Sequence, residues 1–219
     1  MIDLRPWSED LEHPVLRMMW IFAALLLLPS LALALGVSQS FIPLVGTLCA
    51  LPACVGKNTE LGIKPLELKD FFIVIGAYCL IILFSAIITP GWQKILDGMQ
   101  IPYSEKQDEI IDLLGKGNLQ DRLILFMSVC VITPVVEEVL FRRIIYSYLV
   151  KVNQFAGIFG TSLLFSIAHF FVFGIPSLLI MGLMFQLIYL CRKNLSAAML
   201  LHGLVNTMVF LMNFCNAEI

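Results

Sequence analysis

The sequence predicts an all-α membrane protein: a polytopic bundle of about seven transmembrane helices, with six to eight as the range. Three observations lead to this fold class. The chain of 219 residues is 59% hydrophobic and only 14% charged, and its mean hydropathy is +0.91. Several apolar runs approach or exceed about 18 residues, the length at which a helix crosses a bilayer. The segments between these runs are too short to form a separate soluble domain.

The charge balance and the cysteines exclude some partners and sites. The 14 basic and 16 acidic residues nearly cancel, so the chain carries no electrostatic footprint for nucleic acid. We therefore expect the lipid bilayer as a partner and no nucleic acid. The six cysteines are scattered through apolar runs, and the one close pair, Cys49 and Cys54, lacks a second pair to complete a zinc site. We interpret all six as buried apolar thiols.

The N-terminal region, residues 1–120, is expected to contain about three spans and a polar loop. The expected spans are 15–35, 41–55 and 70–89, and Pro90-Gly91 closes the third. The first run ends in Ala32-Leu33-Ala34, which a signal peptidase can recognise. Its spanning length and the long acidic segment before it favour a retained helix. In the loop, Ser104 to Gln107 fit a capping box, which predicts an interfacial amphipathic helix or, equally, an ordinary loop helix.

The C-terminal region, residues 121–219, is expected to contain four spans. They are 123–150, 155–171, 177–191 and 195–214. With seven spans, most Lys and Arg residues fall on the side of the N-terminus, which predicts a cell-membrane protein whose N-terminus is cytoplasmic. The phenylalanines at 170, 171 and 173 are interpreted as an aromatic belt at the membrane surface rather than as part of a pocket.

A charged stretch interrupts the fourth span. Glu137, Glu138, Arg142 and Arg143 lie within an apolar run, although a charge at membrane depth costs at least about 2.5–3.5 kcal/mol. Glu138 and Arg142 are four residues apart, a spacing that suits an ion pair on one helix. Glu137 lies about 100° further round the helix and does not need to share that pair. Arg143, nearer the cytoplasmic end, is expected to extend its side chain to the interface.

Three helices place polar groups in one layer of the membrane. Counted from the inner helix ends, Glu137 and His169 lie roughly 20 Å deep, and His202 and Asn206 roughly 10–16 Å deep. His202 and Asn206 also share one helix face. Taken singly, each of these residues is more often an interhelical hydrogen-bonding group. Their common depth instead favours a site, in which an unpaired carboxylate such as Glu137 suits a general base.

Three motifs connect these residues to a known family. They are Glu137-Glu138-x-x-x-Arg142, Phe165-x-x-x-His169 and His202-x-x-x-Asn206. In this order, on separate apolar helices, they resemble the CPBP intramembrane protease family, which includes CAAX prenyl endopeptidases and bacteriocin-processing or immunity-type proteins. The resemblance covers about residues 121–214. Residues 1–120 match the family only in being hydrophobic.

The resemblance implies an endopeptidase that hydrolyses a peptide bond within the membrane by a glutamate-activated water. Glu137 would be the general base, and His169 would help to position the water. His202 and Asn206 would stabilise the oxyanion that forms on the substrate. The supporting residues would be Glu138 and Arg142. The implied partner is a membrane-associated or lipidated peptide or protein.

Other possibilities stay open. Two histidines and a glutamate can bind zinc, but the chain has no H-E-x-x-H motif and the glutamate mechanism needs no metal, so we expect no cofactor. A non-catalytic membrane protein could keep the same scaffold for immunity or partner binding. A small transporter or proton relay could use Glu137 and the histidines.

Overall fold

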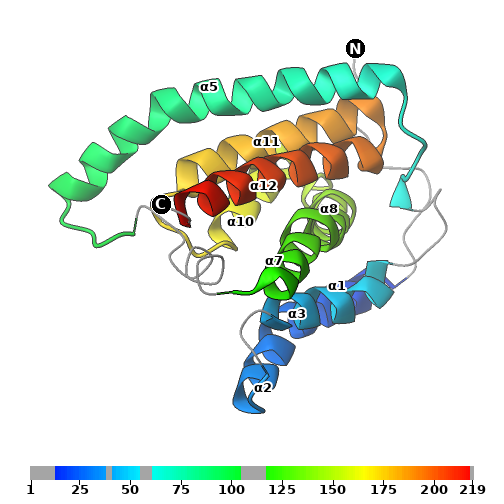
Figure 1. The fold of residues 1–219 in the computed structure, drawn as a ribbon. Coiled ribbons are helices and arrows are strands. Elements are labelled where there is room, and N and C mark those ends of the chain that lie inside the picture. Colours follow the sequence, from blue (N-terminus) through cyan, green and yellow to red (C-terminus); the bar gives the residue numbers. More distant parts are fainter. Residues whose placement is uncertain (1–12, 38–40, 55–60, 105–116, 218–219) are drawn as a thin grey trace.

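The computed structural model describes residues 13–37, 41–54, 61–104 and 117–217, and this part of the chain is helical without strands (Figure 1). The helices long and apolar enough to cross a membrane are Pro14–Ala34, Leu68–Gly98, Leu119–Leu149, Ile175–Arg192 and Leu195–Cys215. Two shorter apolar helices are Ile42–Cys54 and Ala156–Ile167. These elements confirm the polytopic helical bundle and coincide with the seven expected spans. Within the described residues, five of these helices are long enough to cross a membrane, whereas the sequence predicted seven spans.

The first helix pair forms a hairpin at the edge of the molecule. Helix α1 (Pro14–Phe22) continues through a π-helical turn (Ala23–Leu27) into α2 (Leu28–Ala34), so Pro29 does not end the helix. The returning helix, α3 (Ile42–Ala50), ends in a 3₁₀ turn (Leu51–Cys54). Gly46 makes the pair close, because a Cβ on it would lie 2.9 Å from the Pro29 ring.

Helix α5 (Leu68–Gly98) is longer than the sequence indicates. The expected end at Thr89 is wrong, since the helix continues through Pro90-Gly91 to Gly98. A proline removes one N–H from the hydrogen-bond ladder, and membrane helices tolerate that loss where neighbouring helices support them. Figure 1 shows α5 crossing α11 (Ile175–Arg192) and α12 (Leu195–Ala217) from end to end.

The fourth span is one continuous helix in which α-helical and π-helical segments alternate. Its segments are α7 (Leu119–Phe126), the π-helical Met127–Ile132, α8 (Thr133–Glu138), the π-helical Val139–Ile145 and α9 (Tyr146–Leu149). The Asn118 side chain accepts a hydrogen bond from the Asp121 N–H and caps its start. The two glutamates therefore lie in the short α-helical stretch between two wider π-helical segments. Such π segments often mark functional sites.

The fifth span ends earlier than expected. After a π-helical turn (Ala156–Gly160), α10 (Thr161–Ile167) ends at Ile167 rather than at residue 171. The left-handed backbone of Phe170, with φ 51°, cannot continue the helix and explains the difference. His169 consequently lies on the connection between α10 and α11 rather than inside a helix. Helices α10 and α11 pack closely, because Gly182 has no Cβ to meet Ser162 at 3.1 Å.

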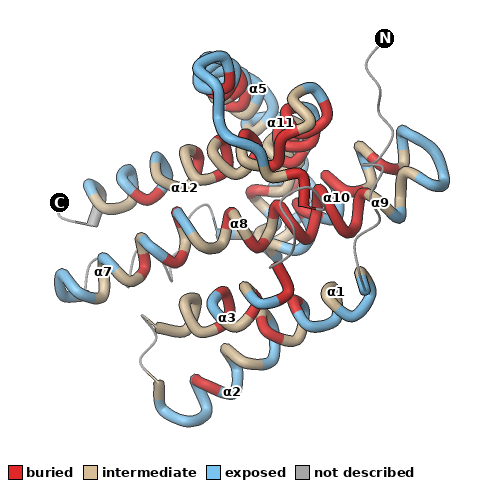
Figure 2. The backbone as a smooth tube through the Cα atoms, turned by 90° about the vertical axis from the view of Figure 1, so that its right-hand side faces the viewer, coloured by how far each residue is buried: buried red, intermediate tan, exposed pale blue. Residues whose placement is uncertain are grey.

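Contacts at the two ends of the bundle agree with the expected alternation of spans. At one end, Arg192 pairs with Glu67 and Asp70 at the start of α5. At the other end, the Arg122 guanidinium lies 5.0 Å from the Phe214 ring centroid. Buried residues concentrate in α8, in the π-helical Val139–Ile145 that follows it, and in α10 (Figure 2). The amphipathic helix expected after Ser104 lies outside the described residues.

Candidate active site

The two adjacent glutamates of α8 point to different surroundings. Glu138 is fully buried, whereas the Glu137 side chain is 17% exposed and lines a cavity. The angle of about 100° between consecutive helical residues produces this division. One carboxylate is thereby enclosed by protein while its neighbour meets the cavity.

The Glu138 carboxylate joins two other helical segments. Its Oε2 accepts a hydrogen bond from Arg142 Nε at 2.9 Å, the contact that the sequence predicts. Its Oε1 lies 3.0 Å from His202 Nδ1, a contact that the sequence reasoning missed. Because a carboxylate accepts, Nδ1 carries the proton and Nε2 faces the other way. His202 Nε2 lies 3.8 Å from Glu137 Oε2.

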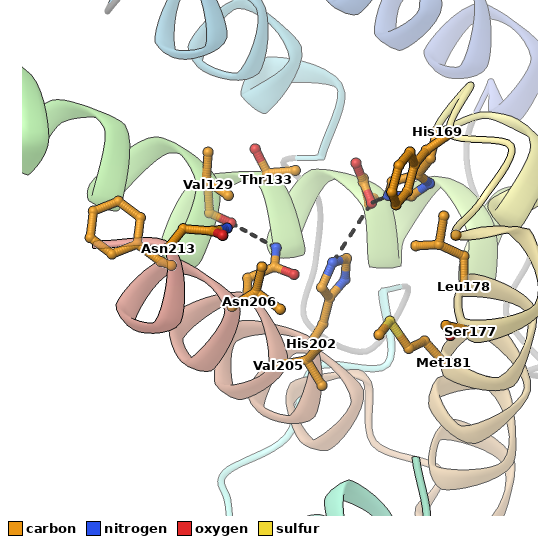
Figure 3. A pocket seen from close by; sticks show the side chains of 15 residues that line it. Val129, Thr133, His169, Ser177, Leu178, Met181, His202, Val205, Asn206 and Asn213 are labelled. Atoms are coloured by element: carbon orange, nitrogen blue, oxygen red, sulfur yellow. Dashed lines mark hydrogen bonds and ion pairs between the residues drawn. The ribbon is translucent and has the colours of Figure 1, made fainter. Parts of the chain in front are cut away.

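His169 approaches the Glu137 carboxylate from the α10–α11 connection. Its Nδ1 lies 2.8 Å from the Phe165 carbonyl oxygen, which can only accept, so Nδ1 carries the proton. The remaining nitrogen, Nε2, lies 3.9 Å from Glu137 Oε2. The His169 and His202 rings, both labelled in Figure 3, therefore approach the Glu137 carboxylate from different elements. Glu137 Oε2 has no hydrogen-bond partner among the described residues, so one carboxylate oxygen and two Nε2 atoms face a common point.

Asn206 holds α12 against the fourth span. Its Nδ2 donates to the Val129 carbonyl at 2.8 Å. The Thr133 N–H bonds to the Ser128 carbonyl five residues back, and in that register Val129 would require an N–H from Pro134, which has none. Asn206 supplies the missing donor. One N–H of its amide is therefore occupied, and the side chain still lines the cavity.

Aromatic rings surround the Arg142 guanidinium. The ring centroids of Phe165, Phe185 and Phe141 lie 5.1, 5.7 and 6.0 Å from its Cζ. Within the described part of the chain, its Nη1 and Nη2 have no hydrogen-bond partner, so the ring faces stabilise the charge. Phe185 also stacks on His202, with 4.7 Å between centroids and 21° between planes. Sequence reasoning missed Phe185 because no motif marks it among many apolar residues of α11.

The connection from Ala168 to Gly174 forms one wall of the cavity. Phe170 has φ 51° and is 84% exposed, a left-handed conformation that costs a bulky residue about 1–3 kcal/mol. Phe171 turns inward and lines the cavity, so its interpretation as a surface belt residue is wrong. Gly174 permits the inward position of Phe171, because a Cβ on residue 174 would clash with the Phe171 ring.

The cavity measures about 410 Å³ and joins all four expected catalytic residues. Glu137, His169, His202 and Asn206 lie on its walls, beside apolar residues such as Met181 and Val209 (Figure 3). The supporting pair Glu138 and Arg142 lies behind them, fully buried. Arg143 is only 3% exposed, so the expectation that it reaches the interface is wrong.

The side chains around the cavity include groups that can bind metal ions, namely Glu137, His169 and His202. Among the described residues, no three His, Cys, Asp or Glu side chains converge closely enough to hold one. The nearest set, Glu137 with the two histidines, has oxygen-to-nitrogen separations of 3.8 and 3.9 Å. The ligands of a tetrahedral zinc lie about 3.4 Å apart. The metal-free mechanism stays a prediction.

The fold defines a polytopic helical membrane protein, and the comparisons with known proteins relate it to the CAAX proteases. Residues 119–208 match the family model of the type II CAAX prenyl endopeptidase Rce1-like proteins. The chain is similar to the membrane-embedded CAAX protease MroQ of Staphylococcus aureus (strain USA300). The two are 27% identical over 187 residues, which cover 81% of this chain and 73% of that protein. No solved structure matches the chain.

These comparisons and the three motifs together support the CPBP family. The family model covers the region that carries the motifs. The similarity to the staphylococcal protein is longer than the C-terminal region alone. It therefore extends into the N-terminal region, where the sequence motifs gave no indication of kinship.

Proposed function

We propose that the protein is an intramembrane endopeptidase that hydrolyses a peptide bond of a membrane-associated or lipidated peptide or protein through a Glu137-activated water. The observation that carries the proposal is the convergence of His169 Nε2 and His202 Nε2 on Glu137 Oε2, at 3.9 and 3.8 Å. The similarity to CAAX proteases supports the peptidase class. The substrate is a peptide or protein at the membrane.

The first step is proton removal from water. A water that donates one hydrogen to Glu137 Oε2 and the other to His169 Nε2 is oriented by both acceptors. As its oxygen attacks the substrate carbonyl carbon, Glu137 takes the proton. The protonated carboxyl then gives that proton to the amine nitrogen as the C–N bond breaks. This scheme needs His169 neutral, the state that its bond to the Phe165 carbonyl allows.

The oxyanion requires donors on the opposite side of the substrate carbonyl. His202 donates from Nε2 only when its ring is protonated, because Nδ1–H is already directed to Glu138. Arg142, Glu138 and Glu137 carry one net negative charge, so a proton on His202 makes the group neutral. The second N–H of the Asn206 amide is the other donor, since the first bonds to Val129. Each donor is worth about 3–4 kcal/mol in the transition state.

Replacement of the proposed base tests the function. Glu137→Gln keeps the shape of the side chain but cannot accept the proton, so cleavage should fall by at least about 10²-fold. Thermal unfolding in detergent should be unchanged, because Glu137 makes no direct hydrogen bond through Oε2. Comparing membrane proteomes of cells with the wild-type protein and the variant would reveal the substrate as an accumulating precursor.

The same experiment separates the alternatives. Full cleavage by Glu137→Gln would contradict the glutamate mechanism. Biological activity that survives both Glu137→Ala and His202→Ala would favour a non-catalytic role in immunity or partner binding. Flux driven by a pH gradient in liposomes, lost in a Glu137 variant, would favour the proton relay.

We also place the protein in the cell membrane with its N-terminus in the cytoplasm. The support is the excess of Lys and Arg on the side of the N-terminus. Reporter fusions after residues 104 and 193 should read opposite sides of the membrane, with residue 193 cytoplasmic. The reverse pattern would overturn this orientation.

A further inference from the structure

The part of α5 beyond Pro90 reaches the connection that carries His169. Trp92 Nε1 donates a hydrogen bond to the Val172 carbonyl at 3.0 Å. One turn earlier on α5, the Thr89 hydroxyl lies 3.2 Å from the Ser177 hydroxyl, at the start of α11. Had α5 ended at Thr89, as its proline suggests, the Trp92 indole would have no helix to hold it at this position.

A second contact reaches the same connection from the residues that follow α5. The Tyr103 ring stacks on the Phe173 ring, with 5.3 Å between centroids and 15° between planes. The Tyr103 hydroxyl donates to Asp97 Oδ1 at 2.9 Å, which fixes the ring to the last turn of α5. Trp92 and Tyr103 thus hold two adjacent residues of the connection, Val172 and Phe173.

The backbone N–H groups of the connection that donate hydrogen bonds lie toward its two ends, at residues 168–170 and at 174–175, and outside contacts support the part between them. Its internal hydrogen bonds include Gly174 N–H to the Phe171 carbonyl at 3.0 Å and Ile175 N–H to the Val172 carbonyl at 3.3 Å. Phe170 adds a left-handed backbone next to His169. His169 is held from its own side by Nδ1 on the Phe165 carbonyl and by its backbone N–H on the Ser166 carbonyl at 3.4 Å. The Val172 carbonyl, three residues further on, is where α5 adds its hydrogen bond.

We infer that Trp92 and Tyr103 are positioning residues for the reaction: they latch the 168–174 connection so that His169 Nε2 stays beside Glu137. The inference rests on the proposed function, because it concerns the geometry of the same site. Neither side chain lines the cavity, so their effect passes through the connection. The N-terminal region thereby contributes to a site whose cavity is lined by the C-terminal region.

Hydrogen exchange tests the latch without any substrate. Trp92→Phe keeps an aromatic ring and removes the N–H donor, and Tyr103→Leu removes the stacking and the hydroxyl. In both variants of the full-length protein, amides of residues 168–174 should exchange about two- to tenfold faster, as the loss of one hydrogen bond predicts. Ile95→Ala, an exposed position on the same turns of α5, is the control and should not change. Unchanged exchange in Trp92→Phe would overturn the latch.

Turnover tests the consequence for the site. With the latch loosened, kcat should fall about tenfold, because small displacements of a catalytic group are costly. KM and the thermal midpoint should stay near the wild-type values, a separation that a merely structural role would not give. The positioning role would be overturned if Trp92→Phe left kcat unaltered, or if it changed KM alone. If Glu137→Gln cleaves normally, the proposed function fails instead, and the exchange measurement still decides the latch.

Discussion

Glu138 holds a negative charge in full burial between a guanidinium and an imidazole. Its two oxygens are divided between Arg142 Nε and His202 Nδ1, at 2.9 and 3.0 Å. A buried ion pair is stable only while every member keeps its partner. Glu138 therefore fixes the ring of His202 and compensates Arg142 at the same time.

Glu138→Gln should destabilise the protein, whereas Glu137→Gln should not. The neutral amide leaves the buried Arg142 charge uncompensated, at a cost of about 3–5 kcal/mol. Thermal or denaturant unfolding in detergent, measured for the two variants side by side, checks this difference. Equal stability of both variants would mean that Arg142 does not depend on Glu138.

Phe185 is the second residue on which the geometry of His202 depends. Phe185→Leu keeps an apolar side chain but removes the face that stacks on His202 and lies near Arg142. We expect a loss of about 1–2 kcal/mol in stability and a fall in kcat. Phe185→Tyr retains the ring face and should restore part of kcat. If the Leu and Tyr variants have the same kcat, the aromatic face of Phe185 does not contribute to kcat.

At the scale of helices, Pro134 and Asn206 form a matched pair. The proline removes the donor for the Val129 carbonyl, and the asparagine of another helix replaces it. Gly203, one turn earlier, lets α12 approach so closely that a Cβ would lie 3.0 Å from the Cys130 carbonyl. The helix that carries His202 is thus docked on the proline-opened turn of the helix that carries Glu137.

A double-mutant cycle tests this docking. Asn206→Leu leaves the Val129 carbonyl unsatisfied and should lower the free energy of unfolding by about 1–3 kcal/mol. Pro134→Ala restores an N–H at residue 134, so the double variant should regain much of that loss. Activity should not return with it, because Asn206 is also a proposed oxyanion donor. Additive losses in the two single changes would contradict the pairing.

Hydropathy and spacing predicted the helical elements and the residues that gather in the cavity. Apolar runs locate spans well because the bilayer demands them, and four-residue spacing alone indicated the contact of Glu138 with Arg142. The sequence could not indicate that α10 ends at Ile167, that α5 passes through Pro90, or that His202 turns to Glu138. Each depends on tertiary contacts: the packed turn at Gly174, the support given to α5, and the docking of α12.

At the scale of the whole molecule, the bundle combines a long helix with short ones around one cavity. Helix α5 links both ends, from the Asp70 pair with Arg192 to the Trp92 bond with Val172. The segment Ala156–Ile167, by contrast, stops at the level of the cavity, just before His169. The bilayer around the molecule therefore contacts helices of very different lengths.

The short segment has a consequence for the surrounding lipid. At about 1.5 Å per residue, Ala156–Ile167 reaches only about 18 Å, whereas the hydrocarbon core measures about 30 Å. Such hydrophobic mismatch is relieved by local thinning of the bilayer, which brings headgroups and water nearer to Glu137. Turnover in liposomes should therefore be faster in lipids with shorter acyl chains, and equal rates across chain lengths would contradict this. The water that the proposed hydrolysis consumes would thus reach Glu137 through a bilayer that the protein's own short helix makes thin.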